Sequence, residues 1–212
     1  RHVRREERAL ERRRQRQPER TRVESGGERP GAADGARATR VALAGGLLEQ
    51  GRVGAGRGAT IGKWRGAADR AAGGLGSASA RLGPFTIGAL AVVNAVGDVI
   101  ANDGSVLVGS AAPAEVGPFP DPPLGPGENT TLVVVVTDAP LGKVACRLLA
   151  ESAHEGLARA LRPVGTRFDG DIAFALATAG LRTGDEVPPV HLDRLRLECV
   201  DVVSASVRAS VR

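Results

Sequence analysis

Thr130 is the residue of this sequence whose type and position point most directly to chemistry. It follows Asn129 and lies two residues before an apolar run that begins at Leu132. If the chain were cut between these two residues, a free α-amine with a pKa of about 8 would lie beside the Thr130 hydroxyl. The amine can take the hydroxyl proton directly or through water, which makes such a threonine a nucleophile with its own base. A plain β-forming or capping threonine is the simpler interpretation.

The elements around Thr130 suit such a nucleophile. Residues 111–128 hold six of the thirteen prolines and predict an irregular loop with room to be cut. Residues 132–137 (LVVVVT) predict a central strand buried on both faces, because four consecutive valines are β-branched. Asp138 then predicts a helix N-cap, with Pro140 near the first turn. The helix should run to about Leu161 and stop at Arg162-Pro163, with apolar residues on one side: Val144, Leu148, Leu149, Leu157 and Leu161.

The rest of the chain predicts a mixed order of helices and strands. Residues 32–49 predict an amphipathic helix, and residues 191–210 predict a last one. Residues 85–94 predict a buried strand, and residues 171–178 alternate around Ile172, Phe174 and Leu176 as a strand does. Glycine-rich segments cover 51–63 and 73–79, and Asp103-Gly104 predicts a tight hairpin turn.

The net charge of +5 is concentrated at one end of the chain. Residues 1–22 hold ten Arg and four Glu, whereas the remaining residues are close to neutral. We therefore predict a disordered Arg-rich tail over 1–29, with a nucleic-acid-binding arm as the alternative. Four Phe, one Trp and no Tyr argue against stacking on single-stranded nucleic acid. The chain starts at Arg1 and has no Met, so we expect a fragment.

Other chemistry finds little support. Gly54-Ala55-Gly56 with Ala59 imitates a dinucleotide fingerprint, but a helix precedes it and no acidic residue follows at the right distance. Gly62-Lys63 imitates a phosphate-binding loop, but the residue after Lys63 is Trp64. The three histidines lie far apart, so neither a metal site nor any cofactor is predicted, and no run is long enough to span a membrane. Cys146 and Cys199 predict free, buried thiols.

Several blocks of the sequence together resemble the DmpA-like L-aminopeptidase/D-esterases, a family of N-terminal-nucleophile hydrolases. The resemblance covers about residues 30–205 in the right order. Its blocks are VGAG (53–56), GAT (58–60), GKW (62–64), GGLGS (73–77), GAL (88–90), VNAVGD (93–98), NTTL (129–132), VTDAPL (136–141), AHEGLARALRP (153–163) and FDGD (168–171).

The resemblance implies an α+β fold, an αββα sandwich that is incomplete at the N-terminus here. It also implies self-cleavage between Asn129 and Thr130, so that 30–129 would end an α-chain and 130–212 would form a β-chain. A homo-oligomer is implied as well. The residues that match the family's site are Thr130, Lys63, Asn94, Asp169 and Asp171.

The resemblance assigns each residue a role. Asn94 would donate its amide to an oxyanion, and Lys63 would stabilise negative charge and lower the pKa of the Thr130 amine. Asp169 and Asp171, two apart on an extended segment, would point to one face and orient that amine. The simpler interpretations are a cap for Asn94, a solvated Lys63 and a turn at 169–171.

The implied activity is that of a cytoplasmic aminopeptidase or amidohydrolase acting on small peptides, amides or esters. Two alternatives stay open. An acyl transferase like ornithine acetyltransferase shares the fold and also self-cleaves before a threonine. A non-catalytic nucleic-acid-binding module would instead use the basic tail, and its binding would depend on salt.

Overall fold

The structure is a computed structural model that describes residues 30–120, 129–179 and 189–212. The predicted tail over 1–29 and much of the predicted proline-rich loop, 121–128, lie outside the described residues. Residues 111–120 contain no helix or strand, as predicted.

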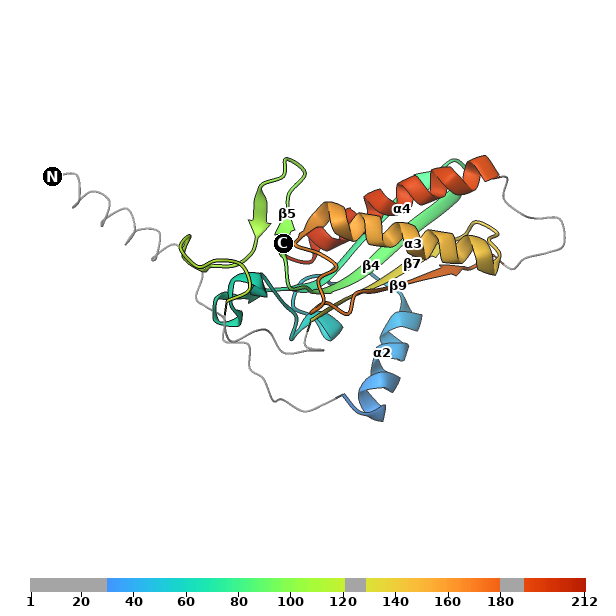
Figure 1. Ribbon diagram of the computed structural model, residues 1–212. Helices are drawn as coiled ribbons and strands as arrows, with labels where there is room; N and C mark the ends of the chain where they lie inside the picture. Colours follow the sequence, from blue (N-terminus) through green and yellow to red (C-terminus); the bar gives the residue numbers. More distant parts are fainter. Residues whose placement is uncertain (1–29, 121–128, 180–188) are drawn as a thin grey trace.

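The elements form one large sheet, two small ones and three α-helices within the described residues (Figure 1). The helices are α2 (Ala32–Ala44), α3 (Lys143–Ala160) and α4 (Pro189–Ala209). Short 3₁₀ turns are η1 (Gly54–Gly56), η2 (Lys63–Arg65) and η3 (Ala67–Asp69). The strands are β1 (Thr60–Ile61), β2 (Ala71–Ala72), β3 (Gly74–Leu82), β4 (Phe85–Asn94), β5 (Asp98–Ile100), β6 (Val106–Val108), β7 (Thr130–Thr137), β8 (Leu161–Arg162) and β9 (Ile172–Ala177).

The large sheet has the strand order β3-β4-β7-β9. β3, β4 and β7 are antiparallel, whereas β9 runs parallel to β7 and is reached through α3. The register pairs Asn94 with Thr130 at one end of the β4–β7 pair and Ile87 with Thr137 at the other. β7 is therefore a central strand, as its valine run predicts.

The core lies between this sheet and the two long helices. Figure 1 shows α3 and α4 side by side over one face of the sheet. Alternate residues of the strands point into this layer, and Val133, Val135 and Ile87 are fully buried there against Leu149 and Leu157. A small hairpin, β5 with β6, turns at Asp103-Gly104 as predicted and pairs with β8 just after α3.

The prediction that β7 is buried on both faces is wrong for the described residues. Its burial alternates, and Leu132 and Val136 are 44% and 37% exposed. The same face of β9 carries the large apolar residues that suggested a strand there, namely Ile172, Phe174 and Leu176, which are also exposed. The two long helices, α3 and α4, cover one face of the sheet, whereas α2 lies on the other side and has no buried residue (Figure 1). The valine run correctly predicts a strand, but it does not predict which faces of that strand are buried.

Three helix predictions need correction. The predicted helix over 32–49 ends at Ala44, where Gly45 takes a positive φ of 71°, and it buries no residue. α3 begins at Lys143 rather than after Asp138, whose carboxylate instead accepts the Thr86 amide at 2.6 Å. Val144, expected on the apolar side of α3, is 73% exposed. The end of α3 before Arg162-Pro163 and the position of α4 agree with prediction.

Candidate active site

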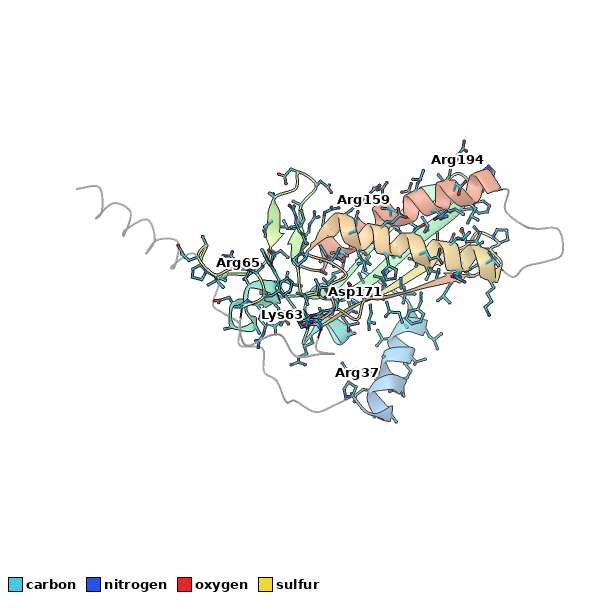
Figure 2. The ribbon with its side chains drawn as sticks, in the orientation of Figure 1. Arg37, Lys63, Arg65, Arg159, Asp171 and Arg194 are labelled. Carbon is cyan, nitrogen blue, oxygen red and sulfur yellow. The ribbon has the colours of Figure 1, made fainter. Side chains whose placement is uncertain are left out.

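Three chain segments meet at one end of the large sheet. β7 begins at Thr130, its antiparallel partner β4 ends at Asn94, and the segment that leads into β9 carries Asp169 and Asp171. Asn129 forms a parallel bridge with Asp169, which fixes that segment beside the start of β7. Figure 2 shows Lys63 and Asp171 at this same end of the sheet. The fold therefore brings together all five residues that the sequence singles out.

The Thr130 hydroxyl lies against the peptide carbonyl that precedes it. Its Oγ1 donates a hydrogen bond to the Asn129 carbonyl oxygen at 2.7 Å. The Gly170 amide donates to the same oxygen at 2.8 Å. Asn129 is 2% exposed, and its side-chain amide reaches the Phe168 carbonyl at 3.4 Å. The Thr130 hydroxyl, a potential nucleophile, is thus in contact with a carbonyl group that also accepts a hydrogen bond from the Gly170 amide.

Lys63 and Asn94 form a buried polar pair. Lys63 is 6% exposed, and its Nζ donates to the Asn94 backbone oxygen at 3.2 Å and to its side-chain Oδ1 at 3.0 Å. Asn94 Oδ1 also accepts the Thr60 amide at 3.0 Å. Because Oδ1 faces these donors, the orientation of the Asn94 amide is fixed. The simpler interpretation of Lys63 as a solvated surface residue does not hold.

The glycine-rich segment explains how Lys63 reaches this position. Gly62 has a φ of 71°, in the left-handed region that glycine adopts without strain. A Cβ at Gly62 would collide with the backbone of Gly109 and Ser110. The Gly62 and Lys63 amides donate to the Gly97 and Val96 carbonyls at 2.8 and 2.7 Å. The segment that imitates a phosphate-binding loop therefore serves to aim a buried lysine.

Asp169 holds backbone in place. Its Oδ1 accepts the Val96 amide at 3.0 Å, and its Oδ2 accepts both the amide and the hydroxyl of Thr166, at 3.1 and 2.8 Å. Both carboxylate oxygens are thus occupied by neighbours other than Thr130. This geometry favours a positioning role that links the end of β4 to the segment before β9.

Asp171 differs from Asp169. Its Oδ1 accepts the Thr131 amide at 2.7 Å, but its Oδ2 is buried without a hydrogen-bond partner among the described residues. The buried Thr131 hydroxyl likewise makes no hydrogen bond of normal geometry there, although it lies close enough to the Asp171 carboxyl to oppose the rise of its pKa. Burial raises the pKa of the Asp171 carboxyl; the Thr131 amide opposes this shift and the nearby Asp169 adds to it. A carboxyl with a raised pKa beside a nucleophile is suited to proton transfer.

Residues that the sequence argument did not single out also shape the site. Thr60 orients Asn94, Thr166 and the Val96 amide hold Asp169, and Gly170 approaches Thr130 closely. Thr60 and Gly170 lie inside the blocks that carry the family resemblance, which was the available signal. The partners of Asp169 depend on a chain reversal at 163–170 that no local pattern predicts.

The other titratable candidates lie apart from this cluster or are inert. His154 is exposed on α3. Cys199 is a buried free thiol whose pKa is raised to about 12, mainly by burial, and Cys146 is a half-buried free thiol. Within residues 30–120, 129–179 and 189–212, no group of three or more His, Cys, Asp or Glu side chains could hold a metal ion. The helices of this part of the chain are all too short or too polar to cross a membrane.

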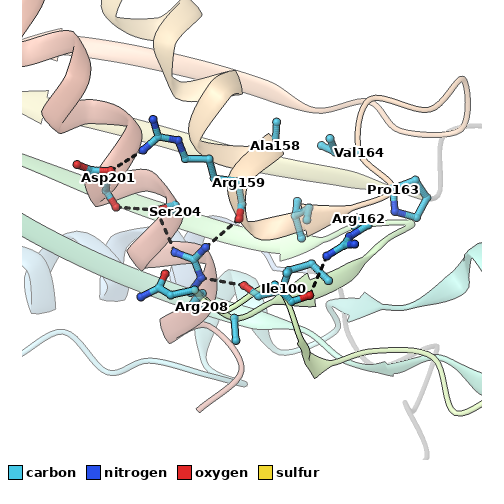
Figure 3. Close-up of a pocket in the computed structure, with 13 residues that line it drawn as sticks. Ile100, Ala158, Arg159, Arg162, Pro163, Val164, Asp201, Ser204 and Arg208 are labelled. Atoms are coloured by element: carbon cyan, nitrogen blue, oxygen red, sulfur yellow. Dashed lines mark hydrogen bonds and ion pairs between the residues drawn. The ribbon is translucent and has the colours of Figure 1, made fainter.

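One hollow in the described surface, with a volume of about 570 Å³, lies away from Thr130. Figure 3 shows it between the ends of α3 and α4 and the β5–β6 hairpin. Its arginines are engaged with protein groups: Arg208 donates to the Ile100 and Arg159 carbonyls at 2.8 Å each, and Arg159 pairs with Asp201 at 2.7 Å. Arg208 thus satisfies one carbonyl at the end of α3 and one at the end of β5, so the hollow has a structural explanation.

The arrangement of the sheet and its two covering helices is similar to the Ntn-hydrolase fold. Comparison with known proteins agrees: the profile of Peptidase family S58 matches residues 25–212, and the chain belongs to that family. It is 42% identical over 138 residues to an uncharacterized aminopeptidase of Mycobacterium bovis, covering 55% of this chain and 38% of the relative. It is 34% identical over 149 residues to a 6-aminohexanoate-oligomer endohydrolase of Paenarthrobacter ureafaciens, covering 63% of this chain and 41% of the relative.

Solved structures give the same assignment. The L-aminopeptidase D-Ala-esterase/amidase of Ochrobactrum anthropi, described as a variant of the Ntn-hydrolase fold, has a TM-score of 0.58 and 26% identity, over 81% of this chain and 47% of the other. A Burkholderia β-aminopeptidase has a TM-score of 0.58 and 25% identity, over 82% and 50%. The predicted family and α+β class are confirmed. The chain spans about two fifths of the length of the curated relatives it matches.

Proposed function

We propose that this protein is an aminopeptidase or amidohydrolase that activates itself by cutting its chain between Asn129 and Thr130. The observation that carries the proposal is the hydrogen bond of 2.7 Å from the Thr130 hydroxyl to the Asn129 carbonyl, at the edge where Lys63 and the Asp171 Oδ2 atom are buried. The similarity to aminopeptidases and to an amide-oligomer hydrolase supports the same reaction class.

In the maturation step, the Thr130 hydroxyl oxygen attacks the Asn129 carbonyl carbon. The bond from that carbon to the Thr130 nitrogen breaks, and the hydroxyl proton ends on the nitrogen, which becomes an amine. Water then hydrolyses the resulting ester and returns a proton to Oγ1. The new α-amine lies beside the hydroxyl and serves as its base, so cleavage creates both the nucleophile and its activator.

In turnover, the same hydroxyl attacks the carbonyl of an amide or ester substrate. The buried ammonium of Lys63 stabilises negative charge near the site and lowers the pKa of the Thr130 amine, which keeps that amine a base near neutral pH. Asn94 supplies its side-chain amide to the oxyanion, with Oδ1 held by Lys63 and Thr60. Asp171 exchanges protons with the amine, and Asp169 positions the segment that carries it.

We further propose a cytoplasmic homo-oligomer, in keeping with the family resemblance and with two cysteines that form no disulfide. Light scattering coupled to size-exclusion chromatography is expected to give a mass of several protomers. A single protomer over the micromolar range would contradict the oligomer.

The activity is tested with 4-nitroanilides of L-alanine and β-alanine as small amide substrates. The parent protein should release nitroaniline, and Thr130→Ala should release none above background. Hydrolysis that survives in a folded Thr130→Ala variant would contradict the proposal. Adding ornithine separates hydrolysis from acyl transfer: free alanine as the main product supports a hydrolase, whereas aminoacyl-ornithine would identify a transferase.

A further inference from the structure

Gly170 holds an unusual position beside Thr130. Its amide donates to the Asn129 carbonyl oxygen at 2.8 Å, the same oxygen that the Thr130 hydroxyl contacts. A Cβ at this position would lie 2.8 Å from Thr130 Oγ1, closer than real Cβ atoms approach other atoms. The residue therefore contributes a donor to one reacting group and leaves room for the other.

We propose that the Gly170 amide is the oxyanion donor of the self-cleavage step, an inference that rests on the proposed function. When Oγ1 attacks the Asn129 carbon, the carbonyl oxygen takes on negative charge. A backbone N–H already aimed at that oxygen stabilises the charge without having to move. The donor acts in maturation, on the protein's own carbonyl, and so differs in role from Asn94.

The surroundings of Gly170 keep this donor in place. Asn129 and Asp169 form a parallel bridge directly before it, and Asp171 accepts the Thr131 amide directly after it. Asp169 is itself tied to Val96 and Thr166 through both carboxylate oxygens. Gly170 is thus held on both sides by carboxylates bonded to backbone amides, although it is itself exposed. The carboxylates of the DGD segment position the central amide between them.

The direct test replaces the Gly170 N–H with an ester oxygen, by incorporating glycolic acid at position 170 during cell-free synthesis of the full-length chain. Formation of a fragment that begins at Thr130 is followed by mass spectrometry. We expect the cleavage rate to fall about 10²–10³-fold, the usual effect of losing one oxyanion donor. The matched control is glycolic acid at Gly104, an exposed glycine whose amide donates to Ala101 at 3.1 Å in a distant hairpin. This control should cleave at the parent rate.

Two further measurements guard against a folding artefact. Gly170→Ala keeps the N–H but places a Cβ against Oγ1, so it should also slow cleavage while leaving the unfolding transition close to the parent's. In uncut Thr130→Ala protein, the exposed Gly170 amide should exchange its hydrogen slowly because it is bonded to Asn129. Parent-rate cleavage of the position-170 ester, or an unprotected Gly170 amide, would overturn the inference alone. A parent chain that never cleaves would overturn the proposed function together with it.

Discussion

The two ends of β7 have similar polar side chains, a threonine and an aspartate at each, but these side chains differ in whether they have hydrogen-bond partners. At the far end, the Thr137 hydroxyl donates to the Thr86 carbonyl at 2.8 Å and accepts the Ala139 amide at 3.2 Å, and Asp138 accepts the Thr86 amide. At the near end, Thr131 Oγ1 and Asp171 Oδ2 are buried without hydrogen-bond partners among the described residues. The side chains of Thr137 and Asp138 are thus hydrogen-bonded, whereas the other end of the strand has two buried polar atoms without partners among the described residues.

This difference separates a stabilising site from a reactive one. A buried polar group without a partner costs roughly 1–3 kcal/mol of stability. Buried ionisable groups with shifted pKa values cluster at functional sites for the same reason, since reactivity needs groups that are not fully satisfied in the resting state. Buried polar atoms without partners therefore lower stability at the Thr130 end, where the proposed chemistry needs reactive groups. The hydrogen bonds at the Thr137 end instead stabilise the pairing of β7 with β4.

Apart from the complete loss expected for Thr130→Ala, the largest effect should come from Lys63. Lys63→Met removes the buried ammonium that contacts both oxygens of Asn94, and self-cleavage and amide hydrolysis should each fall about 10²–10³-fold. Lys143 is the control, because it is the only other lysine and is exposed at the first turn of α3. Lys143→Met should leave both rates unchanged. Equal rates of self-cleavage and amide hydrolysis in the parent and in Lys63→Met would show that Lys63 takes no part in either reaction.

Asp171 gives a smaller effect with a defined dependence on pH. Asp171→Asn should slow cleavage roughly 100-fold, the low end of the range for proton-transfer groups. Burial raises the Asp171 pKa in the folded state, so the folded protein keeps a proton that the unfolded chain releases. Folding stability must therefore fall as pH rises from about 4, the ordinary value, through the raised pKa.

Urea unfolding in a Thr130→Ala background checks this sign on uncut protein. Between pH 4 and pH 7, the stability of Asp171→Asn should increase relative to that of its Asp171 parent. If the stability of Asp171→Asn relative to its parent stays constant or decreases over this range, the pKa of the Asp171 carboxyl is not raised in the folded protein.

The smallest effects test the comparison of the two ends directly. Thr137→Val removes two hydrogen bonds from a residue that is 1% exposed and should lower the free energy of unfolding by roughly 2 kcal/mol. Thr131→Val removes a buried hydroxyl without a partner and should leave stability equal or up to about 1 kcal/mol higher. Both are measured by urea unfolding in the Thr130→Ala background. A similar loss in both variants would mean that the ends do not differ.

Local sequence patterns predict which helices and strands are present, but they do not predict which faces are buried or where every helix begins. The strand at 85–94, the hairpin at Asp103-Gly104 and the helix at 191–210 follow from short-range periodicity and turn chemistry, and each is present. The coverage of β7 was predicted wrongly, since burial of its second face depends on what packs there and not on valine propensity. The start of α3 was missed because Asp138 binds a residue 52 positions away instead of its own helix.

The site residues could be named from the sequence only through the family resemblance. Asn94, Thr130 and Asp171 lie far apart along the chain, and the register of β4 with β7 and of β7 with β9 brings them together. No spacing rule predicts that Asp169 and Asp171 take different hydrogen-bond partners. The burial of Lys63 likewise depends on long-range contacts of a glycine-rich loop.

The central claim is that Thr130 becomes the N-terminal nucleophile by self-cleavage. The most direct measurement is the intact mass and N-terminal sequence of the purified full-length protein beside a Thr130→Ala variant. We predict two pieces in the parent, one of them beginning at Thr130, and a single uncut chain in the variant. A parent that stays whole, or a variant that is cut at the same bond, would contradict the account.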